Sequence, residues 1–230
     1  PRIVRLANEK WAAVFGNGYN NTDNDGHAST TGHGVLFIVF LDPPPSGRWI
    51  EGQHYIKLDT GVGEVATPNG LATPAVVDIE GDATADYIVA GDLRGHLWRF
   101  DVTSTNPTEW KNPSNMARLF TAVDGNGISQ PITTRPEVGG HPENLAGFVV
   151  YVGTGKYLER SDNTALGATT QTFYGIWDVQ GQAVARSELL QQRFTTETTA
   201  TDVQGIQRKV RVSSDTPIDW QRQRGWYIDY

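Results

Sequence analysis

Cysteine is absent from the 230-residue sequence, and methionine occurs once. The lack of cysteine excludes disulfide bonds and thiolate chemistry, but it does not identify a cellular compartment. The sequence also lacks an apolar run of transmembrane length, so no direct membrane span is expected. Basic residues are outnumbered, with 19 Lys and Arg against 26 Asp and Glu, and the net charge of −7 disfavours nucleic acid and anionic lipid as partners.

Aromatic and turn-forming residues are abundant, with seven Trp, eight Tyr, eight Phe, 25 Gly and 12 Pro. This balance favours strands and turns over helices, and the sequence predicts an all-β fold. The best helix candidate, Ala185–Phe194, is short and lacks a sustained amphipathic period, so we expect one or two exposed turns there. The basic cluster Gln207–Arg211 alternates charged and apolar residues and predicts a strand. No signal segment follows Pro1, so any targeting peptide is expected outside these residues.

A unit made of an apolar strand, a Gly-containing turn and a later aromatic strand ending in Asp occurs three times. Its copies are Trp11–Tyr19 with Val35–Asp42, Tyr87–Asp101, and Phe148–Tyr157 with Phe173–Asp178. The turn glycines Gly16, Gly91 and Gly153 are 75 and 62 residues apart, which exceeds the roughly 40 to 50 residues of a four-stranded propeller blade. The pattern therefore indicates either propeller blades with insertions or a β-sandwich with similar strands. Segments 43–47, 106–108 and 139–142 contain Pro and Gly and predict surface connections.

The segment Asp78–Asp86 carries closely spaced acidic residues. Asp78, Glu80, Asp82 and Asp86 occupy relative positions 1, 3, 5 and 9, and Thr84 at position 7 offers its carbonyl oxygen. Ca²⁺ takes six to eight oxygen ligands, and a short loop of this kind curls its oxygens around one point. Apolar residues on both sides predict a loop between two strands of a hairpin. We therefore expect one cation site, and the number of ligands favours Ca²⁺ over Mg²⁺.

The alternative for this segment is a solvated acidic turn without a metal ion. An EF-hand is excluded, because it has Gly at position 6 and Glu at position 12, where this sequence has Ala83 and Val89. Asn21–Gly26 also resembles the opening of a calcium loop, but Gly32 stands where an acidic ligand would complete it, which favours a polar turn. Asp124–Gly127 likewise predicts a turn.

No pattern of catalytic residues supports an enzyme. The histidines lack paired metal-ligand spacing, and each is expected in a loop or on the surface; they are His27, His33, His54, His96 and His141. Gly16–Gly18 and Gly153–Gly155 do not complete a nucleotide-binding motif and predict hairpin turns, and no GxSxG nucleophile elbow is present. Trp98, Trp177 and Trp226 offer faces for a sugar or a quinone, but packing between strands is their expected role.

Several uncommon motifs, taken in order, resemble the propeller domain of the PilC/PilY family of type IV pilus biogenesis and adhesion factors. They are Trp11 with Val14–Tyr19, Asn69–Pro74, the acidic loop, Gly91–Asp101, Gln130–Thr133 with Pro136, Tyr151–Tyr157, Gln171 with Tyr174–Asp178, and Gly225–Tyr227. The resemblance spans nearly the whole chain and implies a modified β-propeller. A complete propeller of seven blades needs about 300 residues or more, so residues 1–230 are expected to form either a single propeller domain or a propeller fragment of a larger protein.

The resemblance also implies work outside the cytoplasm, at the pilus tip, the cell surface, or the outer membrane and periplasm. Members of the family promote pilus assembly against retraction and contribute to adhesion, and calcium occupancy tunes that balance. The resemblance places one Ca²⁺ in the segment that holds Asp78, Glu80, Asp82, Thr84 and Asp86. It implies as partners pilin or minor pilin subunits, a host or other surface ligand, and an N-terminal adhesive region of the same protein.

Three functions follow as hypotheses. The first is a calcium-binding, non-enzymatic module that regulates pilus extension against retraction and surface attachment. The second is a quinoprotein-like propeller enzyme, which would need a central funnel of convergent charged groups and a bound quinone with visible absorbance. The third is a purely structural propeller scaffold, which would be insensitive to a chelator.

Overall fold

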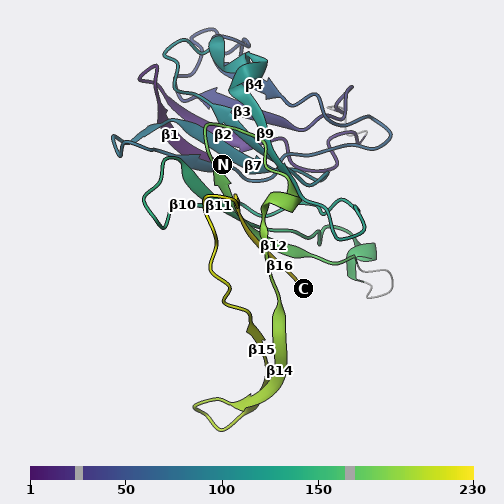
Figure 1. Ribbon diagram of the computed structural model, residues 1–230. Coiled ribbons are helices and arrows are strands. Elements are labelled where there is room, and N and C mark those ends of the chain that lie inside the picture. Colours follow the sequence, from purple (N-terminus) through teal and green to yellow (C-terminus); the bar gives the residue numbers. More distant parts are fainter. Residues whose placement is uncertain (24–27, 164–168) are drawn as a thin grey trace.

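The computed structural model describes residues 1–23, 28–163 and 169–230. Its strands form three sheets and one hairpin that projects away from them (Figure 1). The 3₁₀ turns are Glu109–Lys111, Pro113–Asn115, Arg160–Asn163 and Arg186–Glu188. Within the described residues, no helix is long and apolar enough to span a membrane. The predicted all-β class is confirmed.

Sheet 1 has the strand order β4-β3-β2-β1-β6. Its strands are β1 Arg2–Leu6, β2 Trp11–Gly16, β3 Val35–Phe40, β4 Tyr55–Asp59 and β6 Thr84–Ala85. The first four strands form an antiparallel meander, whereas β6 comes from later in the chain and pairs in parallel with β1.

Sheets 2 and 3 repeat the meander. Sheet 2 has the order β5-β7-β8-β9, with β5 Ala75–Val77, β7 Tyr87–Gly91, β8 His96–Asp101 and β9 Met116–Thr121. Sheet 3 has the order β10-β11-β12-β16-β13, with β10 Glu137–Gly140, β11 Phe148–Gly153, β12 Thr172–Asp178, β13 Leu190–Gln192 and β16 Gly225–Asp229. The projecting hairpin consists of β14 Phe194–Thr201 and β15 Gln207–Ser213 and is inserted between β13 and β16.

The threefold repeat predicted from the sequence is confirmed, because each copy supplies the second and third strands of one sheet. Gly16, Gly91 and Gly153 each end the second strand. The first strand of each sheet begins directly after a proline; these prolines are Pro1, Pro74 and Pro136. Three equivalent antiparallel meanders that follow one another along the chain are the blades of a β-propeller.

Two apolar layers hold the three sheets together. Leu36 and Ile38 of sheet 1 belong to one layer with Ile88 of sheet 2. Val89 of sheet 2 belongs to the other layer with Val150 of sheet 3. The adjacent residues Ile88 and Val89 serve opposite layers because side chains alternate across a strand. Each fully buried aliphatic or aromatic side chain contributes about 1.5–3 kcal/mol, so these layers account for the stacking.

The loops at one end of the sheets pack so closely that glycine is required. A Cβ atom on Gly16 would lie 2.2 Å from the carbonyl oxygen of Leu71, and a Cβ atom on Gly91 would lie 2.0 Å from the Ile132 side chain. Leu71 and Ile132 are fully buried. They belong to the segments 69–73 and 130–135 that lead into sheets 2 and 3, which we call the lead-in segments. Each lead-in segment thus lies against the glycine turn of the preceding sheet.

Asp92 is a buried carboxylate that ties the lead-in segment of sheet 2 to the turn between β7 and β8. Its Oδ2 lies 2.9 Å from Asn69 Nδ2, 3.0 Å from His96 Nδ1 and 2.8 Å from Trp98 Nε1. Its Oδ1 accepts hydrogen bonds from the backbone N–H groups of Arg94 and His96. Burial raises the pKa of Asp92, but interactions with His96, Trp98 and Asn69 outweigh burial and leave that pKa below its ordinary value. Trp98 is therefore a packing residue, as predicted.

The structure corrects two expectations and confirms two others. One of the turns expected in Ala185–Phe194 is present at Arg186–Glu188, but the rest of the segment enters β13 and β14, because β13 pairs with β16. Segment 139–142 is not a surface connection, since its glycines belong to β10 and His141 is buried between Trp177 and Trp220. The strand expected at Gln207–Arg211 is confirmed as β15, and Asp124–Gly127 forms the expected turn.

Candidate metal site

The acidic loop connects β5 to β7, the first two strands of sheet 2. These strands pair in an antiparallel manner, so the predicted hairpin placement is correct. The loop is closed at its base by a hydrogen bond of 2.9 Å from the Asp86 N–H to the carbonyl oxygen of Val77. Inside the loop, β6 pairs with β1, with Arg5 opposite Thr84 and Leu6 opposite Ala85. The loop therefore belongs to sheet 2 and is also attached to sheet 1.

Three of the predicted ligand residues come together in this loop. One carboxylate oxygen each from Asp78, Glu80 and Asp86 lies within 4.8 Å of the others. Two oxygens on opposite sides of a Ca²⁺ ion are about 5 Å apart, because each Ca–O distance is roughly 2.3–2.6 Å. Asp78 and Glu80 are exposed and Asp86 is half-buried. The cluster thus has oxygen donors, spacing and access that fit a hard divalent cation.

Backbone hydrogen bonds hold the carboxylates in place. Asp78 accepts hydrogen bonds from the N–H groups of Gly81 at 2.7 Å, Asp82 at 3.2 Å and Ala83 at 2.8 Å. Asp86 Oδ2 accepts one from the Ile79 N–H at 2.7 Å. These bonds fold the loop back onto its first acidic residue, so the orientation of Asp78 and Asp86 is set by the backbone.

The carboxylate of Asp82 does not belong to the three-carboxylate cluster. Asp82 Oδ1 accepts a hydrogen bond of 2.7 Å from the Thr84 N–H, and Thr84 is part of β6. Of the four carboxylates predicted as ligands, the structure brings together those of Asp78, Glu80 and Asp86, and the predicted Thr84 carbonyl ligand stays a prediction.

The turn of the loop uses a backbone conformation that favours glycine. Ala83 has φ of 67° and Gly81 has φ of 75°. Ala83 is residue 6 of the loop, the position at which an EF-hand loop places glycine for a sharp turn. An L-residue with a side chain is strained there by about 1–2 kcal/mol. The loop thus adopts a tight turn at its sixth residue even though its sequence departs from the usual glycine.

The carboxylates of Glu80 and Asp86 interact unfavourably when both are ionised. A hydrogen bond with Asp86, together with the negative charge of Asp86, raises the pKa of Glu80 above its ordinary value. The charge of Asp82 acts in the same direction. A bound divalent cation would replace this repulsion by attraction and would favour the ionised form of Glu80. The donor set therefore fits a divalent cation chemically as well as geometrically.

The other candidate sites differ from this loop. Asn21–Gly26 and His27 lie partly or wholly outside the described residues, since 24–27 are not among them. His33 pairs with Asp59 at 2.9 Å and His96 contacts Asp92. Among the side chains that the structure describes, no second group of three metal-ligating residues converges. The pairing of β6 with β1 could not be found from the loop sequence, because its partner lies about 80 residues away.

Comparison with known proteins connects this fold to a family. Residues 1–209 match the PilY1 beta-propeller domain family. The chain belongs to this family. It is 35% identical to the type IV pilus biogenesis factor PilY1 of Pseudomonas aeruginosa and 34% identical to a PilY1 homolog of Xylella fastidiosa, and both alignments cover 100% of this chain. The chain spans 21% and 15% of the lengths of these two relatives.

A solved member of the PilY1 family has the same fold. The crystal structure of the Pseudomonas aeruginosa PilY1 C-terminal domain superimposes with a TM-score of 0.78 and 33% sequence identity. The alignment covers 100% of this chain and 49% of that domain. The resemblance to the PilC/PilY family and the predicted β-propeller architecture are thereby confirmed.

Proposed function

We propose that this chain is the calcium-binding, non-enzymatic propeller module of a type IV pilus biogenesis and adhesion factor. In this proposal, Ca²⁺ occupancy regulates pilus extension against retraction and surface attachment. The convergence of Asp78, Glu80 and Asp86 within 4.8 Å carries the proposal, and membership of the PilY1 family supplies the pilus context.

The site is proposed to hold one Ca²⁺. Asp78, Glu80 and Asp86 would supply carboxylate oxygens, and Asp82 and Thr84 remain as proposed additional ligands after a local adjustment of the loop. The raised pKa of Glu80 supports this assignment, because neighbouring carboxylates are relieved by a cation. The ion would act structurally, since the three carboxylates belong to the loop that connects sheet 2 to sheet 1.

The proposed surroundings follow from the same family. The module would work outside the cytoplasm, at the pilus tip, the cell surface, or the outer membrane and periplasm. Its proposed partners are pilin or minor pilin subunits, a host or other surface ligand, and an N-terminal adhesive region of the same protein. Residues 1–230 would act there as one propeller unit within a larger protein.

Calorimetric titration tests the metal site. Chelator-treated protein should bind one Ca²⁺ per chain. It should bind Mg²⁺ much more weakly, because Mg²⁺ is smaller and needs a near-ideal octahedron of oxygens, which few oxygens of the loop can supply. Glu80→Gln and Asp86→Asn should each weaken Ca²⁺ binding by about tenfold or more, because each replaces one carboxylate with a neutral amide. At a free Ca²⁺ concentration of 100 Kd, the unfolding free energy should rise by about 2.7 kcal/mol.

Asp42→Asn provides the matched control, because Asp42 is an exposed carboxylate outside the loop. It should leave Ca²⁺ binding and thermal stability unchanged. If the wild type shows no heat of binding, or if Glu80→Gln and Asp86→Asn both show the full heat of binding, the loop is a solvated acidic turn and not a metal site.

The pilus role needs a cellular measurement. Glu80→Gln and Asp86→Asn, placed in the full-length factor, should lower the number of surface pili in retraction-competent cells. Deleting the retraction motor should restore pili in the same variants, because the proposed role opposes retraction. Equal loss of pili with and without the motor would contradict regulation and would indicate a failure of assembly or folding.

A further inference from the structure

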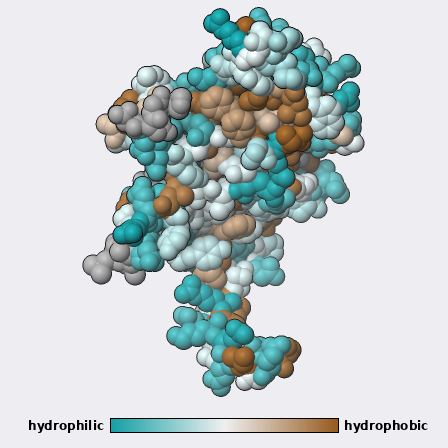
Figure 2. All heavy atoms as spheres, turned by 180° about the vertical axis from the view of Figure 1, so that it is seen from behind, coloured by the Kyte–Doolittle hydropathy of each residue, from teal (hydrophilic) through white to brown (hydrophobic). Residues whose placement is uncertain are grey.

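The projecting hairpin of β14 and β15 is exposed on both faces. All residues of its two strands except Phe194 are exposed, and Val203 and Ile206 in the turn between the strands are 95% and 52% exposed. Seen from behind, the hairpin stands clear of the body of the molecule and carries hydrophobic side chains near its tip (Figure 2). A two-stranded hairpin alone is marginally stable in water, and independent stability needs three or more strands or packing against another element. The hairpin therefore has the exposure and the strand number of an element that a partner completes.

The two faces of the hairpin differ in chemistry, because side chains alternate across each strand. The first face carries the pairs Thr196–Val212, Thr198–Val210 and Ala200–Arg208, and the second face carries Glu197–Arg211, Thr199–Lys209 and Thr201–Gln207. On the second face, the Glu197 carboxylate lies 3.8 Å from Arg211 Nε, and the Glu197 side chain is 57% exposed. The first face is thus largely β-branched, and Glu197 on the second face has room for another basic neighbour.

The two edges of the hairpin also differ. β15 carries three basic residues, Arg208, Lys209 and Arg211, and charged side chains on an edge strand discourage pairing with a further strand. β14 has threonine at five of its eight positions, contains no proline or basic residue, and has Glu197 as its single charge. Within the described part of the chain, β14 pairs with β15 alone, so every second residue of β14 directs its backbone N–H and C=O groups away from the hairpin. β14 is therefore an open edge, whereas the edge of β15 is protected.

The pairing with β15 shows which kind of strand β14 accepts. Side chains of a strand stand roughly perpendicular to the sheet, so those of β14 contact neighbours on either edge. On the β15 side, the neighbours are a basic residue opposite Glu197 and valines opposite Thr196 and Thr198. A strand on the free edge meets the same side chains. A basic residue beside Glu197 is attracted there and an acidic residue is repelled, which sets the charge of the new strand as well as its apolar positions.

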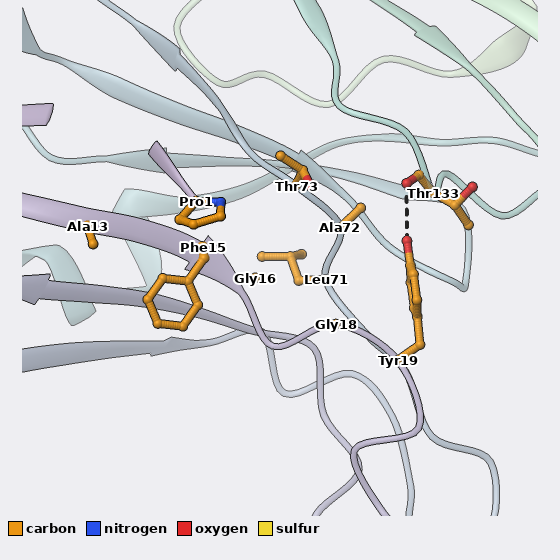
Figure 3. A pocket seen from close by; sticks show the side chains of 10 residues that line it. All are labelled: Pro1, Ala13, Phe15, Gly16, Gly18, Tyr19, Leu71, Ala72, Thr73 and Thr133. Atoms are coloured by element: carbon orange, nitrogen blue, oxygen red, sulfur yellow. Dashed lines mark hydrogen bonds between the residues drawn. The ribbon is translucent and has the colours of Figure 1, made fainter. Parts of the chain in front are cut away.

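A cavity on the body of the molecule lacks such selectivity. It has a volume of about 540 Å³ and is lined by residues of sheet 1 and of both lead-in segments, including Phe15 and Leu71 (Figure 3). The Tyr19 hydroxyl donates a hydrogen bond of 3.1 Å to the carbonyl oxygen of Thr133 at one side. None of the described residues that line the cavity has a charged side chain. The cavity therefore does not select a ligand by charge, whereas the hairpin does.

We propose that β14 is the docking edge for an added β-strand from another protein, a strand with a basic residue opposite Glu197 and β-branched residues opposite Thr196 and Thr198. The added strand completes a three-stranded sheet, in which main-chain hydrogen bonds give affinity and alternate side chains give specificity. This role goes beyond the proposed calcium-dependent function, because the hairpin is a separate two-stranded sheet that does not include the acidic loop.

A labelled peptide that copies Gln207–Ser213 is the probe, because this sequence already pairs with β14. The control peptide contains the same seven residues with the two valines side by side, which keeps the charge and breaks the alternation. The copied peptide should bind saturably in fluorescence anisotropy, and the control peptide should bind about fivefold more weakly or less. Equal binding of the two peptides would overturn the proposal, because it would show only attraction of a basic peptide to an acidic chain.

A charge reversal tests the position of the peptide. Glu197→Lys should weaken binding of the copied peptide by about fivefold or more, because attraction to a basic residue becomes repulsion. Asp42→Lys is the matched control, since it makes the same change of charge at an exposed residue outside the hairpin, and it should leave binding unchanged. Full binding to Glu197→Lys would overturn the proposal.

Amide hydrogen exchange shows which edge is occupied. The peptide should slow exchange in Phe194–Thr201 and leave exchange in Gln207–Ser213 unchanged, because the new strand adds to β14 while β15 keeps its place. Faster exchange in Gln207–Ser213 would mean that the peptide displaces β15, and the proposed edge would be wrong.

Two further measurements test other occupants of the edge. Sedimentation of the chain over a range of concentrations, with Thr198→Lys as the variant, reports pairing of β14 with a second copy. Exchange in Phe194–Thr201 of the full-length factor without peptide reports pairing with another segment of the same protein. A dimer that Thr198→Lys dissociates, or slow exchange of β14 in the full-length factor alone, would overturn the proposal. A monomer whose β14 exchanges rapidly in both proteins supports a strand from another protein.

Discussion

At the scale of single residues, Ala83 is where the sequence and the local backbone disagree. Its φ of 67° lies in the left-handed region, which costs an alanine about 1 kcal/mol. The strain is offset by the bonds around it, since its own N–H donates to Asp78 at 2.8 Å. Ala83 therefore has the backbone conformation that is usual for glycine, although it carries a side chain.

Ala83→Gly should tighten Ca²⁺ binding by about threefold, or about 0.6 kcal/mol. Glycine adopts a positive φ without strain, although its extra freedom in the unfolded chain offsets part of the gain. The measurement is calorimetric titration of the variant beside the wild type. Ala66→Gly is the control, because Ala66 is exposed and has no positive φ; it should leave binding unchanged. Weaker binding in Ala83→Gly would mean that the alanine side chain has a packing role.

At the scale of elements, the sequence predicted strands that carry their own pattern. β7 and β8 are apolar strands buried on both faces and joined by a short turn, and the glycine turns located all three repeats. Among the strands that the sequence did not predict, β13 and β6 have only three and two residues, which hold too little periodicity, and their parallel partners are distant in sequence. Ala185–Phe194 has helix-forming residues, but pairing of β13 with β16 outweighs that weak local preference.

In the acidic loop, too, some features were predicted from the sequence and others are decided by contacts within the fold. The apolar residues on both sides were enough to place the loop on a hairpin, and the spacing of the acidic residues named four carboxylates, three of which converge. The exclusion of Asp82 from the cluster depends on a hydrogen bond from the Thr84 N–H, which follows from the path of the backbone into β6. His141 was expected in a loop or on the surface; it lies in the loop directly after β10, but contacts with Trp177 and Trp220 from distant segments bury it. Contacts between remote segments are what a single sequence leaves undetermined.

At the scale of the whole molecule, sheets 1 and 2 are joined in two ways. The apolar layer between them is broad and does not depend on any ion. The pairing of β6 with β1 is narrow, with two residues on each strand, and it belongs to the loop that holds the carboxylates. Ca²⁺ bound at the proposed site would therefore stabilise the strand pairing at one edge of sheet 1 and would leave the stacking of the sheets intact.

Hydrogen exchange should detect this coupling between sheets. Ca²⁺ should slow amide exchange in 78–86 and also in Arg2–Leu6, because ordering of the loop stabilises the two-residue pairing of β6 with β1. Glu80→Gln should abolish both effects. Gln207–Ser213 in the projecting hairpin is the internal reference and should exchange at the same rate with Ca²⁺ and with chelator, since it lies in a separate two-stranded sheet. Protection confined to 78–86 would mean that the ion orders its own loop and transmits nothing to β1, and calcium regulation would then have to act on a partner that contacts the loop itself.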